Sequence, residues 1–341
     1  MDDCGSVKGV ILTAGDEAGS VGWDPGPGLL LPLANTPLVE RVLGEYARAG
    51  IQETLISAGR DTGEIASLCG DGARWDMILT CRDAPDDQGA TEKSNLERVR
   101  ELALFTKNAP FLVTAGPLLL ESEVYGSLIQ TYRETHPRGI RAGRRAGSTG
   151  IQAGRRAGNS PGNANESTGI YLMTPHVYDA LICEKAGEDT PDNLFDAALE
   201  ELTRRGETVL GLDLDIRPFG VRSPEAYLAS NERLLASVGE ETSMPEIMDD
   251  NFSSPNLVLR PPACVDATAE LERCRIGPGV CIGPGVRIGH GAAIEHSVIM
   301  EGADIGDGAS ISHAVIGRHA GIENRSVIHG RANRVRVVRS K

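Results

Sequence analysis

The stretch RIGPGVCIGPGVRIGHGAAI, residues 275–294, decides the fold of the C-terminal part of the chain, because isoleucine recurs in it every six residues. A period of six fits neither an α-helix nor a flat strand. It is typical of a triangular parallel β-helix in which each side turns one isoleucine inward. After Ile276, Ile282, Ile288 and Ile294, the repeat slips by one residue before Ile305 and Ile311, and again before Ile316 and Ile322. We predict a left-handed parallel β-helix of hexapeptide repeats from about residue 257 to 330.

The glycines of the repeat and the basic tail extend the β-helix prediction to its corners and to its C-terminal end. A glycine follows most of the isoleucines, and we expect it to make the corner of each turn; these are Gly277, Gly283, Gly289, Gly306 and Gly317. Each buried isoleucine contributes about 1.5–3 kcal/mol, so the stack does not need a large conventional core. In the tail 331–341, valines alternate with arginines, which predicts a short strand laid over one end of the stack.

Upstream of this repeat, strand-like and helix-like segments alternate. The apolar strand runs are 10–12, 54–56, 77–80, 111–113, 170–173 and 209–214. The helical patterns are 37–49, 61–68, 92–106, a segment from 175, 192–204 and 224–235. This alternation predicts an open α/β sheet that is mostly parallel. We therefore divide the chain into an α/β domain at 1–235, a linker at 236–256 and a β-helix with a C-terminal strand at 257–341.

An eleven-residue tandem duplication interrupts the α/β pattern. Residues 139–149 read GIRAGRRAGST and residues 150–160 read GIQAGRRAGNS. The duplication has few large apolar residues, so we predict a mobile basic loop or an irregular hairpin. It either has no role or uses Arg144, Arg145, Arg155 and Arg156 to contact phosphate or an acidic partner.

Composition and charge narrow the function. The 341 residues carry a formal net charge of −14, which argues against nucleic acid or an anionic membrane surface as a partner. The seven cysteines have no CxxC spacing, so we expect reduced thiols rather than a zinc or disulfide framework. Neither a signal peptide nor a long apolar span is visible, and we expect a cytoplasmic protein.

Several segments resemble the sugar-phosphate nucleotidyltransferases. They are LLPLANTPLVERVLGEYARAGI at 30–51, STGIYLMTP at 167–175, SPEAYLASNERLL at 223–235 and the repeats HSVIMEGADIG and AVIGRHAGI. The repeats look most like long-form glucose-1-phosphate thymidylyltransferases, and next like mannose-1-phosphate guanylyltransferases. The resemblance implies a Rossmann-like, GT-A-like domain that joins an NTP to a sugar 1-phosphate and releases pyrophosphate with the help of Mg²⁺.

The residues at the family's site positions do not suit that reaction. The phosphate loop is replaced by Ala14, Gly15, Asp16, Glu17, Ala18 and Gly19, without the family's arginine. Gly28 stands at the lysine position, and Pro117 and Gly220 stand at the two positions of the metal-binding aspartates. The turn that would hold the sugar phosphate is absent. We therefore assign no catalytic residue and no metal ligand, and predict a catalytically degenerate homologue with a regulatory or scaffold role.

Two alternative functions remain open, as does the identity of the partners. A divergent active enzyme would use Mg²⁺ and the arginines of the duplication. A hexapeptide acyltransferase would use a β-helix histidine as general base, with His290, His296, His313, His319 and His329 as candidates. We expect a homo-oligomer, or a hetero-oligomer with an active paralogue, and a nucleotide or a sugar phosphate as ligand.

Overall fold

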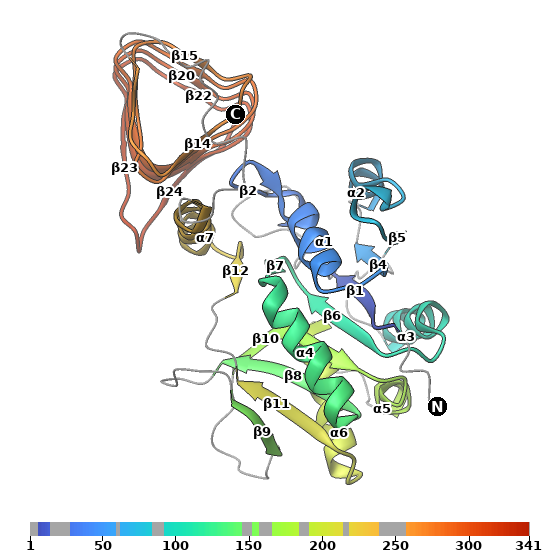
Figure 1. Cartoon of the computed structure of the whole chain (residues 1–341). Helices are drawn as coiled ribbons and strands as arrows, with labels where there is room; N and C mark the ends of the chain where they lie inside the picture. The colour runs from blue at the N-terminus through green and yellow to red at the C-terminus, as the bar shows by residue number, and fades with distance from the viewer. Residues whose placement is uncertain are drawn as a thin grey trace. The chain divides into compact units, whose positions relative to one another are not determined.

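The computed structural model describes residues 6–13, 28–58, 62–83, 92–144, 152–156, 166–183, 191–213, 218–238 and 257–340 (Figure 1). These residues form two compact units. The second unit holds Leu31–Leu38 and the described chain from Phe219 onward, and the first unit holds the rest. Helix α7 (Pro224–Val238), which the sequence analysis placed in the α/β domain, is therefore part of the second unit.

The first unit is built on a mixed sheet. Its order within the described residues is β5 (Ile78–Asp83), β4 (Glu53–Ala58), β1 (Lys8–Leu12), β6 (Phe111–Ala115), β10 (Glu166–Met173), β8 (Gly139–Arg144), β11 (Val209–Asp213) and β9 (Gln152–Arg156). The first four strands are parallel, as predicted. Strand β10 runs antiparallel to both of its neighbours, so the second half of the sheet is mixed.

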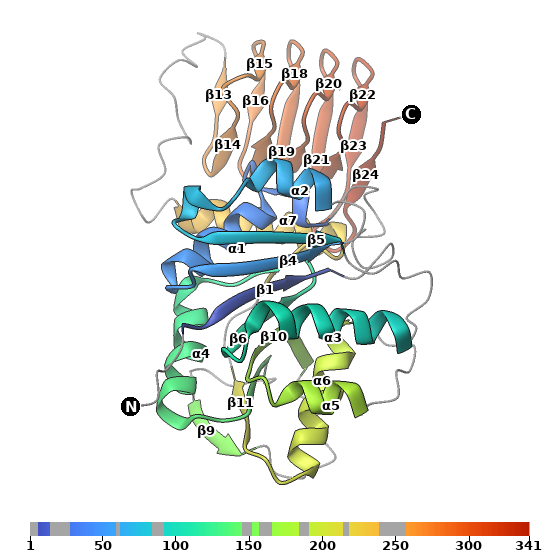
Figure 2. The same ribbon diagram turned by 90° about the vertical axis from the view of Figure 1, so that its right-hand side faces the viewer.

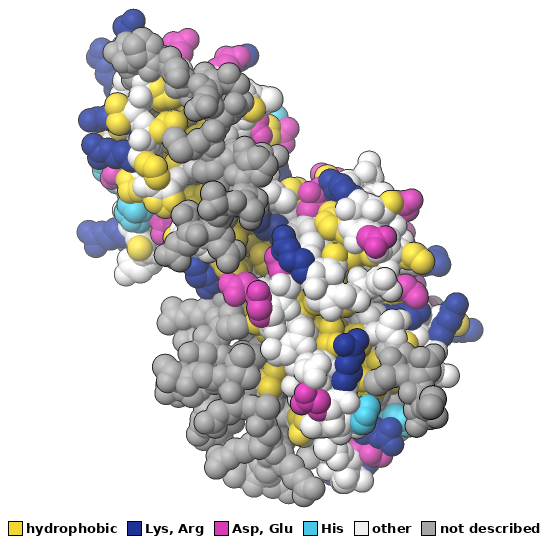
Figure 3. Space-filling model, viewed as in Figure 1, with side chains coloured by type: hydrophobic (Ala, Val, Ile, Leu, Met, Phe, Trp, Pro, Cys, Tyr) yellow, Lys and Arg dark blue, Asp and Glu magenta, His cyan; other side chains and the backbone are white. Residues whose placement is uncertain are grey.

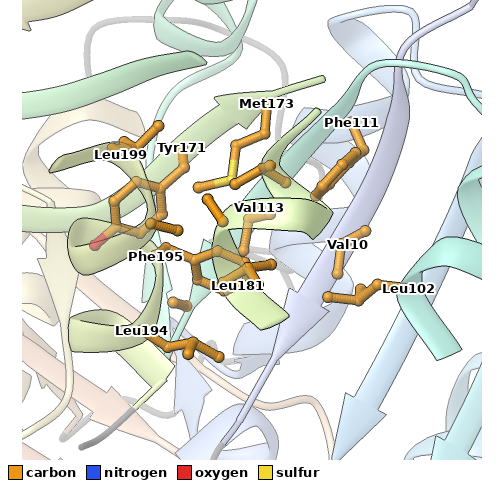
Figure 4. Close-up of a cluster of buried hydrophobic side chains, with 14 of the residues drawn as sticks. Val10, Leu102, Phe111, Val113, Tyr171, Met173, Leu181, Leu194, Phe195 and Leu199 are labelled. Atoms are coloured by element: carbon orange, nitrogen blue, oxygen red, sulfur yellow. The ribbon is translucent and has the colours of Figure 1, made fainter. Parts of the chain in front are cut away.

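Helices α1 (Leu38–Arg48), α2 (Thr62–Cys69), α3 (Glu92–Thr106), α4 (Ser122–Thr135), α5 (Val177–Cys183) and α6 (Pro191–Arg204) complete this unit. One face of the sheet packs with α3, α5 and α6 around a buried cluster that includes Val10, Val113, Tyr171, Phe195 and Leu199 (Figure 4). Within each strand the cluster takes alternate residues, such as Val10 and Leu12 on β1, so these residues share one face of the sheet. The apolar residues that the sequence pattern marks therefore form the core between the sheet and these helices, as expected.

The other face of the sheet requires a glycine. A Cβ atom on Gly9 of β1 would lie 2.6 Å from the ring of Tyr46 on α1. The Tyr46 hydroxyl shares a 2.7 Å hydrogen bond with Thr114 on β6, and its ring contacts the ring of Tyr125 on α4 edge-on. Burial raises the pKa of both tyrosines, so they remain neutral. Gly9 therefore allows α1 to approach β1 closely.

The sequence analysis predicted a mobile basic loop or an irregular hairpin for the tandem duplication, but its described residues form two separate strands. The first copy supplies β8 and the second copy supplies β9, and both strands pair with β11. Strand β8 is central in its half of the sheet, and Ile140 and Ala142 on it are fully buried. Two alternating apolar residues are enough to make this segment a buried strand, because the neighbouring strands supply most of the core.

The second unit contains a stack of parallel coils, which we call the coil stack (residues 257–340). Its strands are β13 (Val258–Leu259), β14 (Ala263–Val265), β15 (Glu270–Leu271), β16 (Arg275–Ile276), β17 (Val280–Ile282), β18 (Arg287–Ile288), β19 (Ala293–Ile299), β20 (Asp304–Ile305), β21 (Ser310–Ile316), β22 (Gly321–Ile322), β23 (Val327–His329) and β24 (Arg336–Val338). Partners such as Ile288 and Ile305 are seventeen residues apart. Figure 1 shows the triangular outline of the stack and Figure 2 shows its coils side by side.

The isoleucines of the repeat line the interior, as predicted. Ile276, Ile282 and Ile288 all belong to one buried cluster that runs through the stack. The one-residue slips have a structural cause. At one corner, β19 and β21 continue from one side of the triangle to the next, and His296 and His313 turn this corner with positive φ. At this corner β19 and β21 use five residues instead of six, so Ile294 and Ile311 are seventeen residues apart, whereas Ile276 and Ile294 are eighteen apart.

The glycines after the isoleucines do not all form the corners. Gly277 has a positive φ, but the left-handed conformation otherwise falls at glycines further along, such as Gly285, Gly291 and Gly308. Gly289 and Gly306 are needed for a different reason. A Cβ atom on either one would lie within 2.5–2.8 Å of side-chain and backbone atoms of the next coil. These glycines therefore allow close stacking of successive coils.

The basic tail forms the short strand that the sequence analysis predicted at one end of the stack. Strand β24 pairs in parallel with β21, with Val337 opposite Val315 and Val338 opposite Ile316. It extends one side of the triangle by another strand. Val338 packs against the buried cluster of the stack, which accounts for the apparent break in the alternation.

Candidate functional site

The carboxyl edge of the parallel strands is where α/β proteins bind ligands. At this edge the Thr13 N–H donates to the Ser57 carbonyl (3.0 Å) and the Gly116 N–H donates to the Leu12 carbonyl (2.8 Å). The loop predicted to face phosphate begins directly after Thr13. Its residues Ala14, Gly15, Asp16, Glu17, Ala18 and Gly19 lie outside the described residues.

Gly28 and Pro117 offer no ligand group from their side chains. Gly28 begins a short 3₁₀ helix (Gly28–Leu30) and is buried. Pro117 is buried between β6 and β7 (Leu118–Leu119), and the Leu118 N–H donates to the Gly116 carbonyl across it at 3.0 Å. If the site uses a cation near Gly28 or a carboxylate near Pro117, another residue has to supply it.

Gly220 lies on β12 (Phe219–Gly220) in the second unit. Its N–H donates to Ser230 Oγ (3.1 Å), and the Ser230 hydroxyl donates back to the Gly220 carbonyl (2.9 Å). No heavy atom lies within 4 Å of the place a Cβ would take, so the position has room for a side chain that it lacks. Neither Pro117 nor Gly220 can supply the carboxylate oxygens that Mg²⁺ prefers. Among the residues that the structure describes, no three His, Cys, Asp or Glu are grouped to hold a metal.

The arginines of the duplication are not brought together by the described backbone. Arg144 ends β8, on one side of β11, and Arg145 lies outside the described residues. Arg155 and Arg156 lie on β9, on the other side of β11, opposite Gly211 and Leu210. The two copies of the motif therefore flank one strand instead of forming one basic loop.

Sequence reasoning missed a group of charged residues in the first unit. Arg82, the last residue but one of β5, lies beside its register partner Ser57 on β4, and Arg98 on α3 is only 4% exposed. Burial raises the pKa of Glu101 on α3, while Arg82 and Arg98 oppose that rise. The fold brings these residues close together, and their spacing in the sequence does not indicate that they form a group.

The five histidines occupy four different positions around the coils. His296 and His313 stack on each other, with ring centroids 4.9 Å apart, and Glu232 on α7 bonds His296 Nδ1 at 2.8 Å. His290 contacts Arg273 and His329 bonds Ser310. His319 lies beside Gly302 in another part of the coil. They do not converge on one place in the described stack.

The PLANTPL segment is fixed by hydrogen bonds within the second unit. Its turn residues Ala34 and Asn35 have positive φ, between β2 (Pro32–Leu33) and β3 (Thr36–Pro37). The Ala34 N–H donates to Asn231 Oδ1 on α7 (2.8 Å), and Asn35 Nδ2 donates to the Ile282 carbonyl of the coil stack (2.7 Å). The Tyr227 hydroxyl donates to the Pro32 carbonyl (2.6 Å). The segment that carries the family resemblance therefore has a structural role here.

Comparison with known proteins supports a sugar-phosphate nucleotidyltransferase family. Residues 259–338 match the family model described as the GMPPB C-terminal domain. The chain is also 25% identical to a UTP–glucose-1-phosphate uridylyltransferase of Staphylococcus haemolyticus over 209 residues, which are 50% of this chain and 72% of that protein. It is 26% identical to UTP–glucose-1-phosphate uridylyltransferase 2 of Staphylococcus saprophyticus over 216 residues, 52% of this chain and 74% of that protein. A particular closeness to thymidylyltransferases stays a prediction.

No helix in the described part of the chain is both long enough and apolar enough to cross a membrane.

Proposed function

We propose that this chain is a catalytically degenerate homologue of the sugar-phosphate nucleotidyltransferases, with a regulatory or scaffold role in nucleotide-sugar metabolism. The proposal rests above all on Pro117 and Gly220, which occupy the two positions where the resemblance puts metal-binding aspartates. Loss of a single charge that stabilises phosphoryl transfer costs on the order of 10³–10⁵ in rate. The absence of both carboxylates, together with the acidic loop and Gly28, would remove most of the expected rate.

We infer in addition that the coil stack is a left-handed parallel β-helix of hexapeptide repeats and that the first unit is a GT-A-like nucleotidyltransferase domain. The seventeen-residue register and the interior isoleucines support the first inference. The parallel strands β5, β4, β1 and β6 support the second. Under this reading the two units are the parts of one divergent member of that family.

The test is calorimetry of the full chain with UTP, dTTP or GTP and Mg²⁺, followed by a pyrophosphate-release assay with glucose 1-phosphate or mannose 1-phosphate. We expect no Mg²⁺-dependent increase in nucleotide affinity and no turnover. Turnover above about 1 s⁻¹, a usual enzyme rate, would refute degeneracy. It would favour the alternative, an active sugar-1-phosphate nucleotidyltransferase of dTDP-glucose or GDP-mannose type.

A restored variant sharpens this test. Gly220→Asp has room for its side chain, and Pro117→Asp adds the second carboxylate. We expect the double variant to gain Mg²⁺-dependent nucleotide binding that the wild type lacks. The double variant Pro117→Asn/Gly220→Asn is the matched control, because it adds similar volume without charge. Equal behaviour of the two double variants would show that the missing carboxylates are not what limits the wild type.

We further propose that the protein is an oligomer and that the coil stack contributes to its interface. Val258 in the first coil and Val327 in the last coil are 43% and 68% exposed, and the ends of a short solenoid need covering. In the view of Figure 3, arginine side chains also lie along the outer edge of the coil stack. Light scattering should show dissociation with Val327→Glu and none with Ile78→Glu, a change at an equally exposed position on β5. The reverse result would move the interface to the first unit, and a monomeric wild type would refute the proposal.

A further inference from the structure

Two cysteines lie side by side on neighbouring coils. Cys264 on β14 and Cys281 on β17 are register partners in parallel strands. Residues of the same strands, Val265 and Ile282, belong to the interior cluster, whereas the two cysteines do not. Because side chains alternate along a strand, both sulfurs point outward from the same side of the triangle.

This outward side is covered. Cys264 is 7% exposed and Cys281 is 1% exposed, although neither faces the interior. Helix α7 lies on this side, since Asn231 Oδ1 accepts a hydrogen bond from Cys281 Sγ at 3.4 Å. At the far end of the stack, Glu225 of the same helix accepts a hydrogen bond from the Val335 N–H at 3.1 Å. The thiol pair is thus held beneath a helix, with Cys264 the more accessible of the two.

The spacing suits a disulfide. Hydrogen-bonded neighbouring strands lie about 4.8 Å apart, and disulfide-bonded residues have Cα atoms about 4.4–6.8 Å apart. Neither cysteine forms a disulfide in the structure. A disulfide between them would join adjacent coils without a change of register.

We propose that Cys264 and Cys281 form an oxidisable dithiol that responds to low-molecular-weight disulfides. The Cys264 thiolate attacks one sulfur of the small disulfide, forms a mixed disulfide and releases one small thiol. The Cys281 thiolate then attacks Cys264 Sγ, forms the Cys264–Cys281 bond and expels the second small thiol. The two protein thiols lose two protons and two electrons, and the small disulfide takes them up.

Oxidation at this pair changes the contacts of α7. The Cys281 S–H is consumed, so Asn231 Oδ1 loses one of its two donors and keeps the Ala34 N–H. Asn231 is fully buried and also donates to the Tyr227 carbonyl at 2.9 Å. The state of the dithiol is therefore coupled through one buried amide to the turn of the PLANTPL segment.

The test treats the full chain with oxidised glutathione and digests it with trypsin under non-reducing conditions. Cleavage at Arg273 and Arg275 separates the two cysteines, so a disulfide links two peptides and lowers the intact mass by two hydrogens. We expect this cross-link in the wild type and in Cys274→Ala, whose thiol lies inside the stack. Cys264→Ala and Cys281→Ala should lose it. A cross-link between Cys69 and Cys81, which belong to the first unit, gives different peptides.

Amide exchange of residues 31–38 tests the coupling. Oxidation should accelerate exchange at Ala34 roughly two- to five-fold, as expected for loss of one weak hydrogen bond to its acceptor. Cys281→Ala should reproduce this acceleration without oxidant, and Cys264→Ala should not. Persistent glutathione adducts without a cross-link, or both thiols still free after oxidation, would overturn the dithiol. Unchanged exchange in the cross-linked protein would overturn the coupling.

Discussion

The close stacking of coils makes a quantitative prediction at Gly306. In Gly306→Ala the new Cβ would lie 2.6 Å from the backbone nitrogen of Asn324 and 2.5 Å from its side-chain oxygen. That oxygen accepts the Asp307 N–H at 2.8 Å, and the Gly306 N–H donates to the Ile322 carbonyl at 2.8 Å. A methyl group at this position would push apart two coils that are joined by hydrogen bonds on either side of Gly306.

Overpacking of this kind typically costs about 1–3 kcal/mol. Gly321→Ala is the matched control, because Gly321 lies in the next coil and nothing stands within 4 Å of its Cβ position. At such a site alanine stabilises by about 0.4–1 kcal/mol, because it reduces the entropy of the unfolded chain. The two substitutions are chemically identical and should differ in sign.

Hydrogen exchange by mass spectrometry is the suitable assay, because a two-unit protein need not unfold in one step. A loss of 1–3 kcal/mol accelerates exchange in peptides of β20 and β22 about 5- to 150-fold when opening is at equilibrium. Gly321→Ala should leave these peptides unchanged or slow their exchange. Asn324→Ala removes the side-chain amide but leaves the backbone nitrogen 2.6 Å from the new Cβ, so it should not rescue Gly306→Ala. Rescue, or equal behaviour of the two alanine variants, would refute the steric argument.

Three further predictions concern the first unit and the buried thiols. Gly9→Ala should lower the free energy of unfolding by about 1–3 kcal/mol in a urea titration, because its Cβ would meet the buried Tyr46 ring. Gly44→Ala in α1, whose nearest neighbour is 3.9 Å away, should be neutral or stabilising by up to about 1 kcal/mol. Burial raises the pKa of Cys69 to about 12, so the folded state holds this proton more tightly than the unfolded state. Stability should therefore fall as pH rises above 9 toward 12, and Cys69→Ala should reduce that fall in alkaline urea titrations.

The sequence predicted those parts of the fold that depend on periodicity within one segment. Helix α3 spans the expected residues, and the isoleucine repeat lines one interior. The sequence analysis was wrong where pairing with a neighbouring strand determines whether a segment becomes a strand. The residues GIRAGR have little apolar character, but they form β8 because β10 and β11 are available on both sides. The cause of the repeat's slips, a corner turned by His296 and His313, also depends on stacking that a single coil does not reveal.

The candidate site was harder to predict, because under our proposal it is defined by groups that it lacks. The sequence alone identifies Gly28, Pro117 and Gly220 as residues without a charge, through comparison with a family pattern. It could not identify Arg98 and Glu101, which only the fold brings near Arg82. Nor could it show that Cys264 and Cys281, seventeen residues apart, are neighbours, since that follows from the coil length.

The segments that resemble the nucleotidyltransferases differ in what they contact from the positions that depart from that family's pattern. In the PLANTPL segment, Ala34 and Asn35 hydrogen-bond to α7 and to the coil stack, and Tyr227 of the EAYL helix returns a bond to Pro32. At Gly220, by contrast, the space where a side chain would begin is open, and only its backbone is bonded. The matching motif residues thus form hydrogen bonds within the second unit, whereas the surroundings of Gly220 leave space for a side chain. Under our proposal of a degenerate homologue, a chain would keep the first set and lose the second because its assembly matters more than the reaction.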